Sequence, residues 1–64
     1  MKITIPDNAE SWIATWAFSK ALLFAAEFPD RQGKRDGVLY SRGGVVAYVW
    51  RTKTGVHVDV SVKP

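Results

Sequence analysis

Hydrophobic and polar residues alternate with two different periods along this chain of 64 residues. Residues 2–5 and 56–63 alternate one for one, and a period of two is typical of strands with one buried face. From about residue 8 to residue 28 the apolar residues recur at helical spacing, until Pro29 interrupts the pattern. The pattern therefore predicts a strand at each end of the chain and one long helix near its start.

Two further strands are predicted between the helix and the last strand. Residues 30–37 are polar and contain two glycines, which indicates a loop. Residues 38–42 and the β-branched and aromatic residues 45–52 flank Gly43-Gly44, a strong signal for a hairpin turn. The order is therefore β-α-β-β-β, and the fold class is α+β, with one α-helix packed on a mostly antiparallel four-stranded sheet in a single compact domain, 1–64. We expect the first strand to run parallel to the second and to add beside the second or the fourth.

The predicted helix is apolar around more than half of its circumference. Asp7 and Glu10 have the spacing of an N-cap and its partner in the first turn, so the helix is expected to start near residue 8. One half of the helical wheel is expected to face the sheet, because it collects most of the aliphatic and phenylalanine side chains. That half contains Ile13, Ala14, Ala17, Phe18, Ala21, Leu22, Phe24, Ala25 and Phe28.

The other half of the helix carries a ridge of large apolar side chains, Trp12, Trp16 and Leu23, with Lys20 beside it. One interpretation is that the two tryptophans cover the flank of the core. The other is that the ridge is exposed and binds a protein partner, because tryptophan is enriched at the energetic centres of interfaces. Two copies could also bury their ridges against each other as a homodimer. Trp12, Trp16, Lys20 and Leu23 are therefore the candidate protein-binding residues.

The turn between the last two strands decides which side chains the sheet exposes. If residues 53–54 or 54–55 form a two-residue turn, the odd-numbered residues of 45–49 share a face with the valines of the last strand, and Tyr48 and Trp50 point outward. If Gly55 instead closes a type I turn with a bulge, the two faces are exchanged. In the first case Arg51 lies at the end of an apolar face, which counts against it. The small side chains at 45–49 suit a helix rich in phenylalanine, which favours it, so we expect Tyr48 and Trp50 to be at least partly exposed.

The chain carries a net charge of +3 at pH 7, with acidic residues in excess before residue 31 and basic residues in excess after it. This asymmetry is typical either of a protein with an anionic partner or of a basic face that keeps a small protein in solution. The 31–37 loop and the turn at 53–55 should lie at the same end of the sheet. Interleaved cations and aromatic rings there would suit phosphates and stacked bases. The candidate residues for a nucleic acid or another anionic partner are Arg31, Lys34, Arg35, Tyr48, Trp50, Arg51, Lys53 and His57.

The sequence offers no catalytic set and no ligands for a cofactor. His57, Asp59 and Ser61 are the residue types of a hydrolase triad, but they alternate along one predicted strand. Their side chains should point in parallel, whereas each member of a triad must be aimed at the next. One histidine, no cysteine and scattered acids give no metal-binding cluster. We therefore expect a protein that is not an enzyme and that uses neither cofactor nor metal.

Protein binding is the leading functional hypothesis. The lack of cysteine fits a reducing cytoplasm, and the longest apolar run, 21–26, is too short to cross a membrane. The chain starts with Met1 and ends shortly after its last strand pattern, as expected of a complete gene product. Free-standing products of this size are often phage or mobile-element proteins, so we expect an inhibitor or regulator of a host nucleic-acid-handling complex, anti-CRISPR-like in role. The alternative is direct nucleic-acid binding through the basic, aromatic end of the sheet.

Overall fold

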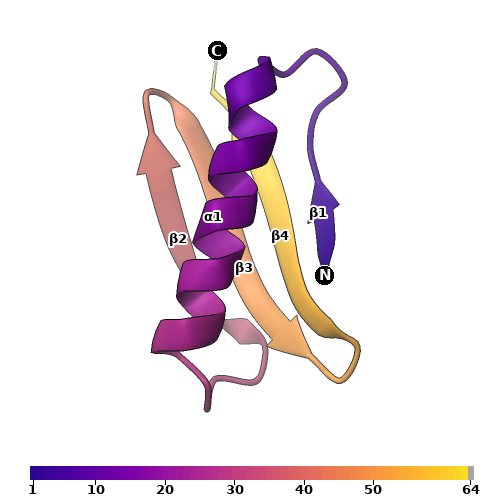
Figure 1. Ribbon diagram of the computed structural model, residues 1–64, viewed down its shortest axis with the longest axis vertical. Helices are drawn as coiled ribbons and strands as arrows, with labels where there is room; N and C mark the ends of the chain where they lie inside the picture. The colour runs from indigo at the N-terminus through magenta and orange to yellow at the C-terminus, as the bar shows by residue number, and fades with distance from the viewer. Residues whose placement is uncertain (64) are drawn as a thin grey trace.

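A computed structural model describes residues 1–63, which form one helix and four strands (Figure 1). The order β-α-β-β-β and the α+β class predicted from the sequence are both confirmed. The elements are β1 (Lys2–Thr4), α1 (Ser11–Glu27), β2 (Gly33–Arg42), β3 (Val45–Thr52) and β4 (Gly55–Val62).

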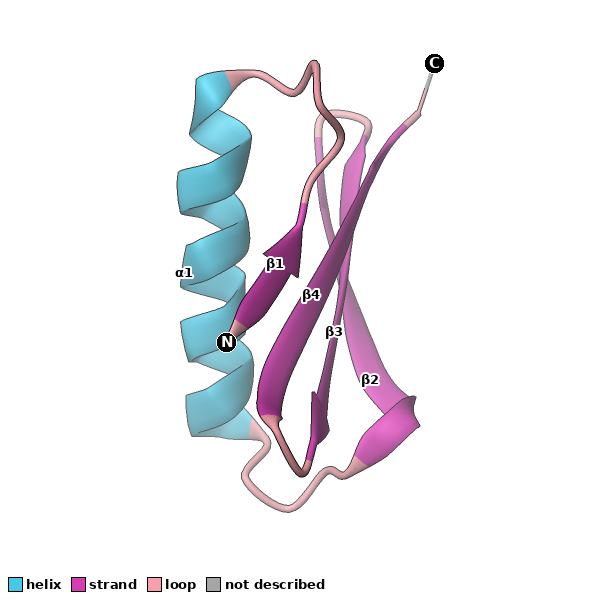
Figure 2. Ribbon diagram, turned by 90° about the vertical axis from the view of Figure 1, so that its right-hand side faces the viewer, coloured by secondary structure: helices cyan, strands magenta, loops and turns pink. Residues whose placement is uncertain are grey.

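The four strands form one mixed sheet in the order β1-β4-β3-β2. Strands β2, β3 and β4 pair antiparallel, while β1 pairs in parallel with β4. The first strand thus adds beside the fourth, one of the two positions that the sequence left open, and it runs in the same direction as β2. Helix α1 lies across one side of the sheet, and no described element covers the other side (Figure 2). We call this uncovered side the open face.

The hairpin between β3 and β4 determines which side chains reach the open face. Thr52 pairs with Gly55, so residues 53–54 form a two-residue turn. In this register Val49 lies opposite Val58 and Ala47 opposite Val60, and all four are buried beneath α1. The two-residue interpretation is therefore confirmed, and Tyr48 and Trp50 point to the open face.

The core combines small and β-branched side chains of the sheet with one stripe of α1. Ala17 and Ala21 are completely buried, which lets the helix lie close to β3 and β4. Larger side chains of the helix flank these two alanines and fill the space on either side. The buried residues are Ile13, Trp16, Ala17, Ala21, Phe24, Val45, Ala47, Val49, Val58 and Val60.

The stripe of α1 that faces the sheet differs from the predicted one. Phe18 and Leu22 are 48% and 51% exposed, whereas Trp16 is only 8% exposed. Trp12 packs against the core, with its ring centre 6.1 Å from that of Trp16. Two indoles bury more apolar area than a phenylalanine and a leucine would, and hydrophobic stabilisation grows with the area buried. The helical-wheel prediction was therefore wrong in phase, and the interpretation in which the tryptophans cover the core is confirmed. The residues of the predicted core half that are exposed are Ala14, Phe18 and Leu22.

The start of α1 also differs from the prediction. The helix begins at Ser11, later than expected, because residues 6–9 form a separate turn. Glu10 occupies the N-cap position without a side-chain capping bond. Its carboxylate instead accepts a 2.8 Å hydrogen bond from the indole N–H of Trp12. Asp7, the predicted N-cap, therefore lies outside the helix.

Arg51 lies on the helix side of β3, where the register puts a charged residue beside valines. Its Nη1 donates hydrogen bonds to the carbonyl oxygens of Phe28, at 2.7 Å, and Arg31, at 3.1 Å. The guanidinium carbon also lies 5.3 Å from the centre of the Phe24 ring. The last carbonyls of a helix have no partners within it, so a cation that bonds them is favourable. Arg51 thus anchors the end of α1, which explains how this register accommodates it.

Strand β2 begins at Gly33, within the segment predicted as a loop. Its pairing with β3 is interrupted between Gly33 and Val38. There the Tyr48 hydroxyl accepts a 3.2 Å hydrogen bond from the Gly37 N–H and donates one to the Lys34 carbonyl. A side chain of β3 therefore replaces backbone bonds that the irregular segment cannot form.

Replacing Arg51 by alanine removes its hydrogen bonds to the carbonyl of Phe28, the C-cap residue of α1, and to that of Arg31 in the following loop. We expect Arg51→Ala to lower the free energy of unfolding by about 2–3 kcal/mol, because a hydrogen bond to a charged group contributes about 1.5–3 kcal/mol. Urea unfolding followed by circular dichroism measures the change. Arg35→Ala, at an exposed arginine, is the matched control and should stay within about 0.5 kcal/mol of the wild type. Equal effects of the two changes would contradict the anchoring role of Arg51.

Candidate functional site

The open face is the polar side of the sheet. Strand residues alternate between the two faces, and paired residues of neighbouring strands share a face. None of the residues on the open face is fully buried, so this side of the sheet is accessible to a ligand. The register assigns to it Lys2, Thr4, Leu39, Ser41, Val46, Tyr48, Trp50, Thr52, His57, Asp59 and Ser61.

Three rings, those of Tyr48, Trp50 and His57, stack on the open face, and we call them the aromatic row. The centre of the Trp50 ring lies 5.6 Å from that of Tyr48 and 5.3 Å from that of His57. The interplanar angles are 29° and 15°. Trp50 and His57 are direct partners across the β3–β4 pair, so the register of that hairpin also forms the row.

A lysine places a positive charge beside the aromatic row, and two hydroxyl groups fix the orientation of its histidine. Lys34 Nζ lies 5.0 Å from the centre of the Trp50 ring, a cation–π contact. Nε2 of His57 is 2.8 Å from Thr52 Oγ1 and 3.1 Å from Thr54 Oγ1. These hydroxyls hold the imidazole in the plane in which it stacks on Trp50.

A glycine allows β2 to approach the aromatic row. A Cβ atom on Gly37 would stand 2.5 Å from Tyr48 Cζ and 2.6 Å from the carbonyl oxygen of Val49. Real Cβ atoms do not come so close to backbone, so only glycine lets the N–H at this position reach the Tyr48 hydroxyl. The same irregular segment carries Lys34 to its position over Trp50.

A shallow pocket lies beside the aromatic row, on the side of β1. Across the parallel pair, Lys2 is opposite His57 and Thr4 is opposite Asp59. The pocket therefore combines aromatic rings with a cation, an anion and a hydroxyl. It has a volume of about 200 Å³ and is lined by Lys2, Thr4, Trp50, His57, Val58 and Asp59.

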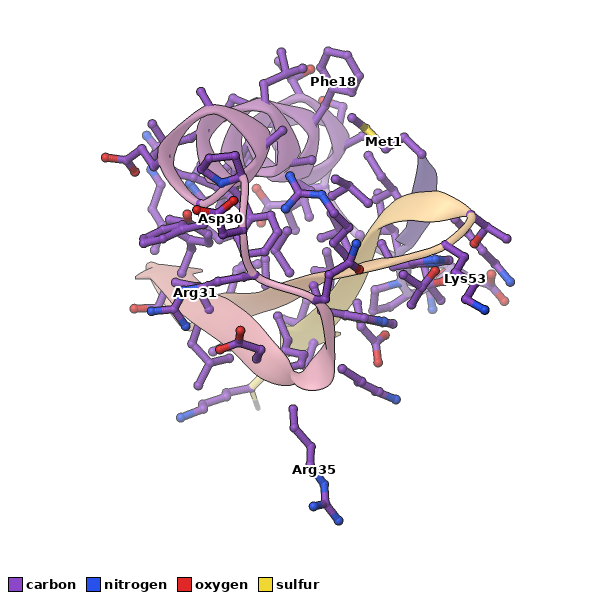
Figure 3. All side chains as sticks on the ribbon, turned by 90° about the horizontal axis from the view of Figure 1, so that it is seen from below. Met1, Phe18, Asp30, Arg31, Arg35 and Lys53 are labelled. Carbon is purple, nitrogen blue, oxygen red and sulfur yellow. The ribbon has the colours of Figure 1, made fainter. Side chains whose placement is uncertain are left out.

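Half of the predicted anion-binding residues come together at this site. Lys53 is exposed in the turn between β3 and β4. Arg35 extends away from α1, on the opposite side of the sheet (Figure 3). The residues that lie in contact on the open face are Lys34, Tyr48, Trp50 and His57.

Arg31 and Arg51 do not join the aromatic row. Arg51 bonds the carbonyls at the end of α1. Arg31 forms a 3.2 Å salt bridge with Asp36, and its guanidinium carbon lies 4.7 Å from the centre of the Phe28 ring. Both arginines therefore have partners within the domain.

A second candidate surface is the outer side of α1, which we call the outer helix face and define by Phe18, Leu22 and Leu23. Leu23 is 40% exposed, and the other two are about half exposed. Phe18 points away from the sheet (Figure 3). The exposed Glu27, one turn after Leu23, borders this apolar surface, and the other neighbouring outward positions carry small or hydroxyl side chains. Those neighbours are Ala14, Thr15, Ser19 and Ala26.

Of the predicted protein-binding residues, only Leu23 belongs to the outer helix face. Trp16 is buried in the core and Trp12 packs against it. Lys20 is half-buried, with its Nζ 5.8 Å from the centre of the Tyr40 ring. These three residues therefore help to close the side of the domain between α1 and β2.

Sequence reasoning missed several residues of the two surfaces. Lys2, Thr4 and Asp59 meet only because β1 adds beside β4, and alternation alone does not fix strand order. Phe18 and Leu22 were assigned to the core. No local signal separated them from the core, because Ala17 and Ala21 lie on the same half of the helical wheel, and packing across the whole interface decides the rotation of the helix.

Within residues 1–63 no helix is long and apolar enough to cross a membrane. In the same part of the chain no three His, Asp or Glu side chains gather closely enough to hold a metal ion. Comparison with known proteins gives no match to any family model, curated protein or solved structure. The surfaces described above therefore carry the evidence for function.

Tyr40, on the helix side of β2, has a shifted pKa. Its hydroxyl is buried and has no hydrogen-bond partner among the described residues. Burial raises the pKa of Tyr40 above its usual 10.0, and the negative charge of Glu27 raises it further. The folded protein therefore holds this proton more tightly than the unfolded chain does.

We expect Tyr40→Phe to be neutral or to raise the free energy of unfolding by up to about 1 kcal/mol, because it removes a buried hydroxyl without a partner. Above pH 10 the unfolded chain loses the Tyr40 proton first, so wild-type stability falls as pH rises from the usual towards the raised pKa. The advantage of Tyr40→Phe should therefore be larger at about pH 11 than at about pH 8 in urea unfolding. Tyr48→Phe, which loses two hydrogen bonds, is the control and should be destabilised. A loss of stability in Tyr40→Phe would show that its hydroxyl is bonded after all.

Proposed function

We propose that this protein binds single-stranded nucleic acid through the open face and is not an enzyme. The observation that carries the proposal is the aromatic row with the Lys34 ammonium over its central ring, Trp50. Aromatic side chains that stack on bases, together with cations that meet phosphates, are the two components of single-strand recognition. Both occur here on the side of the sheet that α1 leaves uncovered.

The aromatic row is held rigidly enough to act as a stacking surface. Tyr48 is fixed at one end by its hydrogen bonds to β2. His57 is fixed at the other end by the hydroxyls of Thr52 and Thr54. Rings that are already immobilised lose little conformational entropy when a base stacks on them, which favours binding.

Cations around the aromatic row outnumber the acidic groups. Lys2 and Lys34 belong to the open face, and Arg35 and Lys53 extend from the segments beside it (Figure 3). Asp59 is the acidic residue that the register assigns to this face. The excess of positive charge attracts a phosphate backbone and makes binding dependent on salt.

An unpaired strand suits this surface better than a duplex. In a duplex the bases stack on one another, so aromatic side chains reach base faces mainly in single strands, loops and ends. Readout of a duplex groove usually needs a protruding helix or a two-stranded ribbon. The helix of this domain lies on one side of the sheet (Figure 2), and the register puts the aromatic row on the other side.

The polar residues of β4 support binding rather than catalysis. His57, Asp59 and Ser61 alternate along one strand and point in the same direction. The hydrogen-bond partners of His57 Nε2 are Thr52 and Thr54. A hydrolase triad instead needs the histidine between an acid and a nucleophile that are both aimed at it.

Trp50→Leu keeps an apolar side chain on the sheet but removes the aromatic plane. We expect it to weaken binding of a fluorescein-labelled oligothymidine about 5- to 150-fold, since stacking of one base contributes about 1–3 kcal/mol. Fluorescence anisotropy measures the affinity. For the wild type, the logarithm of the affinity should fall with the logarithm of salt concentration with a slope of about −3, if four cations each contribute about −0.7.

Leu39→Ala is the matched control, because Leu39 is an apolar residue of the open face outside the aromatic row and is 64% exposed. It should bind like the wild type, and urea unfolding checks that each variant is folded. Lys34→Gln is a second test, since it removes a charge over Trp50 without altering a ring. If the wild type binds no single-stranded DNA or RNA at low salt, the proposal fails.

The outer helix face favours a second candidate function, protein binding. It exposes three large apolar side chains with no charge among them, and contiguous apolar patches mark interaction sites. A phage-type inhibitor or regulator of a host nucleic-acid-handling complex, anti-CRISPR-like in role, would use such a surface. Because the outer helix face and the open face lie on opposite sides of the domain (Figure 2), both can be occupied together.

Interface size limits what this second surface can bind. A standard interface covers roughly 800 Å² of each partner, which is about a fifth of the 4397 Å² accessible surface of the domain. Three half-exposed side chains supply only part of that area, so a partner must also cover the small residues beside them. A second copy is one such partner, with the two helices in an isologous contact. A solution mass of twice 7.1 kDa would identify this homodimer.

Phe18→Ser combined with Leu22→Ser should abolish capture of a protein partner. Both side chains are exposed, so we expect the free energy of unfolding to change by less than about 1 kcal/mol. Affinity capture from a nuclease-treated host lysate, followed by mass spectrometry, shows whether each variant retains the protein partner. Leu39→Ser, on the open face, is the control and should retain it. If the double variant unfolds, the two side chains stabilise the fold and the second candidate loses its support.

A further inference from the structure

We propose that the pocket beside the aromatic row binds one unpaired guanine base. The inference rests on the proposed function and adds a base preference to it. The pocket lies between β1 and the aromatic row, and its lining residues are Lys2, Thr4, Trp50, His57, Val58 and Asp59.

The volume of the pocket limits the ligand to about one base. It is about 200 Å³, well above the roughly 10–15 Å³ that one water molecule needs in a cavity. It is smaller than the roughly 300–1,000 Å³ of pockets that enclose a whole small-molecule ligand. A base fits this space, and its sugar and phosphate must then lie outside, where the cations around the aromatic row are found.

Trp50 and His57 provide the aromatic wall of the pocket. Their rings are direct cross-strand partners, 5.3 Å apart and 15° from parallel. A flat base that enters beside them continues the stack. Stacking grows with the area of overlap, so this wall favours purines over pyrimidines but does not distinguish guanine from adenine.

Three polar side chains at the β1 side of the pocket can bond the edge of the base. Thr4 and Asp59 are neighbours across the parallel strand pair, and Lys2 lies two positions before Thr4 on the same face. All three are exposed, and neither Lys2 nor Asp59 forms a salt bridge within residues 1–63. The pocket therefore offers a carboxylate as acceptor, an ammonium as donor and a hydroxyl that can act as either.

Guanine matches this set better than the other bases. Its Watson–Crick edge presents two adjacent donors, N1–H and the N2 amino group, which the two oxygens of the Asp59 carboxylate can accept together. Its O6 and N7 are acceptors for the ammonium of Lys2. Adenine and cytosine present one amino donor beside a ring nitrogen whose lone pair repels a carboxylate. Thymine and uracil present one N–H between two carbonyl oxygens, which repel it as well. Asp59 is therefore the residue that selects guanine.

The test uses an oligothymidine with one central guanine and matched oligomers with adenine or hypoxanthine at that position. Hypoxanthine is guanine without the N2 amino group, so it isolates one hydrogen bond to Asp59. We expect the wild type to bind the guanine oligomer about 5- to 150-fold more tightly than the adenine oligomer. The hypoxanthine oligomer should bind more weakly than the guanine oligomer. Asp59→Asn should abolish the guanine preference, measured as the ratio of the affinities for the guanine and adenine oligomers. Because it removes a negative charge from the open face, it should bind plain oligothymidine at least as tightly as the wild type does.

Asp36→Asn is the matched control, because it removes a carboxylate that is paired with Arg31 outside the pocket, and it should keep the preference. If plain oligothymidine binds but guanine is not preferred, or if Asp59→Asn keeps the preference, the guanine pocket is overturned and the proposed function stands. If no oligomer binds, both are overturned.

A second experiment uses guanosine monophosphate as a competitor of the guanine oligomer. Weak competition supports the proposal that the pocket binds a guanine within a single strand. Competition as strong as that of the unlabelled guanine oligomer would assign the pocket to a free nucleotide and would contradict the proposal.

Discussion

The two-residue turn at 53–54 fixes which residues of the sheet face α1, and most of the molecule depends on that parity. Because Thr52 pairs with Gly55, the residues 45, 47 and 49 of β3 and the valines of β4 face the helix, whereas Tyr48, Trp50 and His57 face away. A shift by one residue would put Tyr48 and Trp50 beneath the helix and expose the valines to water. Gly55 has a φ of +119°, which strains any residue with a side chain, so the turn depends on glycine at this position.

The elements of the fold were predictable because their signals are local. Alternation, a glycine pair and a helix-ending proline were sufficient for the order and the α+β class. The rotation of α1 was not predictable in this way, because apolar residues cover most of its circumference. Packing decides it: Ala17 and Ala21 let the helix approach the sheet, and Trp16 is buried while Phe18 and Leu22 remain exposed. The choice depends on the area that each rotation buries across the whole interface, which no local spacing reveals.

The kinds of residue at the candidate site, cations and aromatic rings, were predictable from the sequence, but the individual residues were predictable only in part. Lys34, Trp50 and His57 lie together, as the basic loop and the aromatic strand suggested. Arg51 was counted with them, yet its guanidinium bonds the carbonyls at the end of α1. That contact depends on where the helix ends above the sheet, so it has no signature in the sequence. Asp59 enters the pocket only because β1 pairs with β4, and strand order follows from the chain's path over the sheet rather than from alternation.

The two surfaces of the domain differ in how they are covered, and this difference decides which kind of ligand suits each. On the open face the rings of Tyr48, Trp50 and His57 partly cover one another, and the Lys34 ammonium lies over the central ring. A polar, planar ligand can stack on these rings in place of the lysine, and the Lys34 ammonium can then bond a phosphate. Phe18 and the leucines of the outer helix face have no such cover among the described residues. Only another apolar surface can remove them from water, which is why we propose a base as the ligand of the sheet and a protein as the partner of the helix.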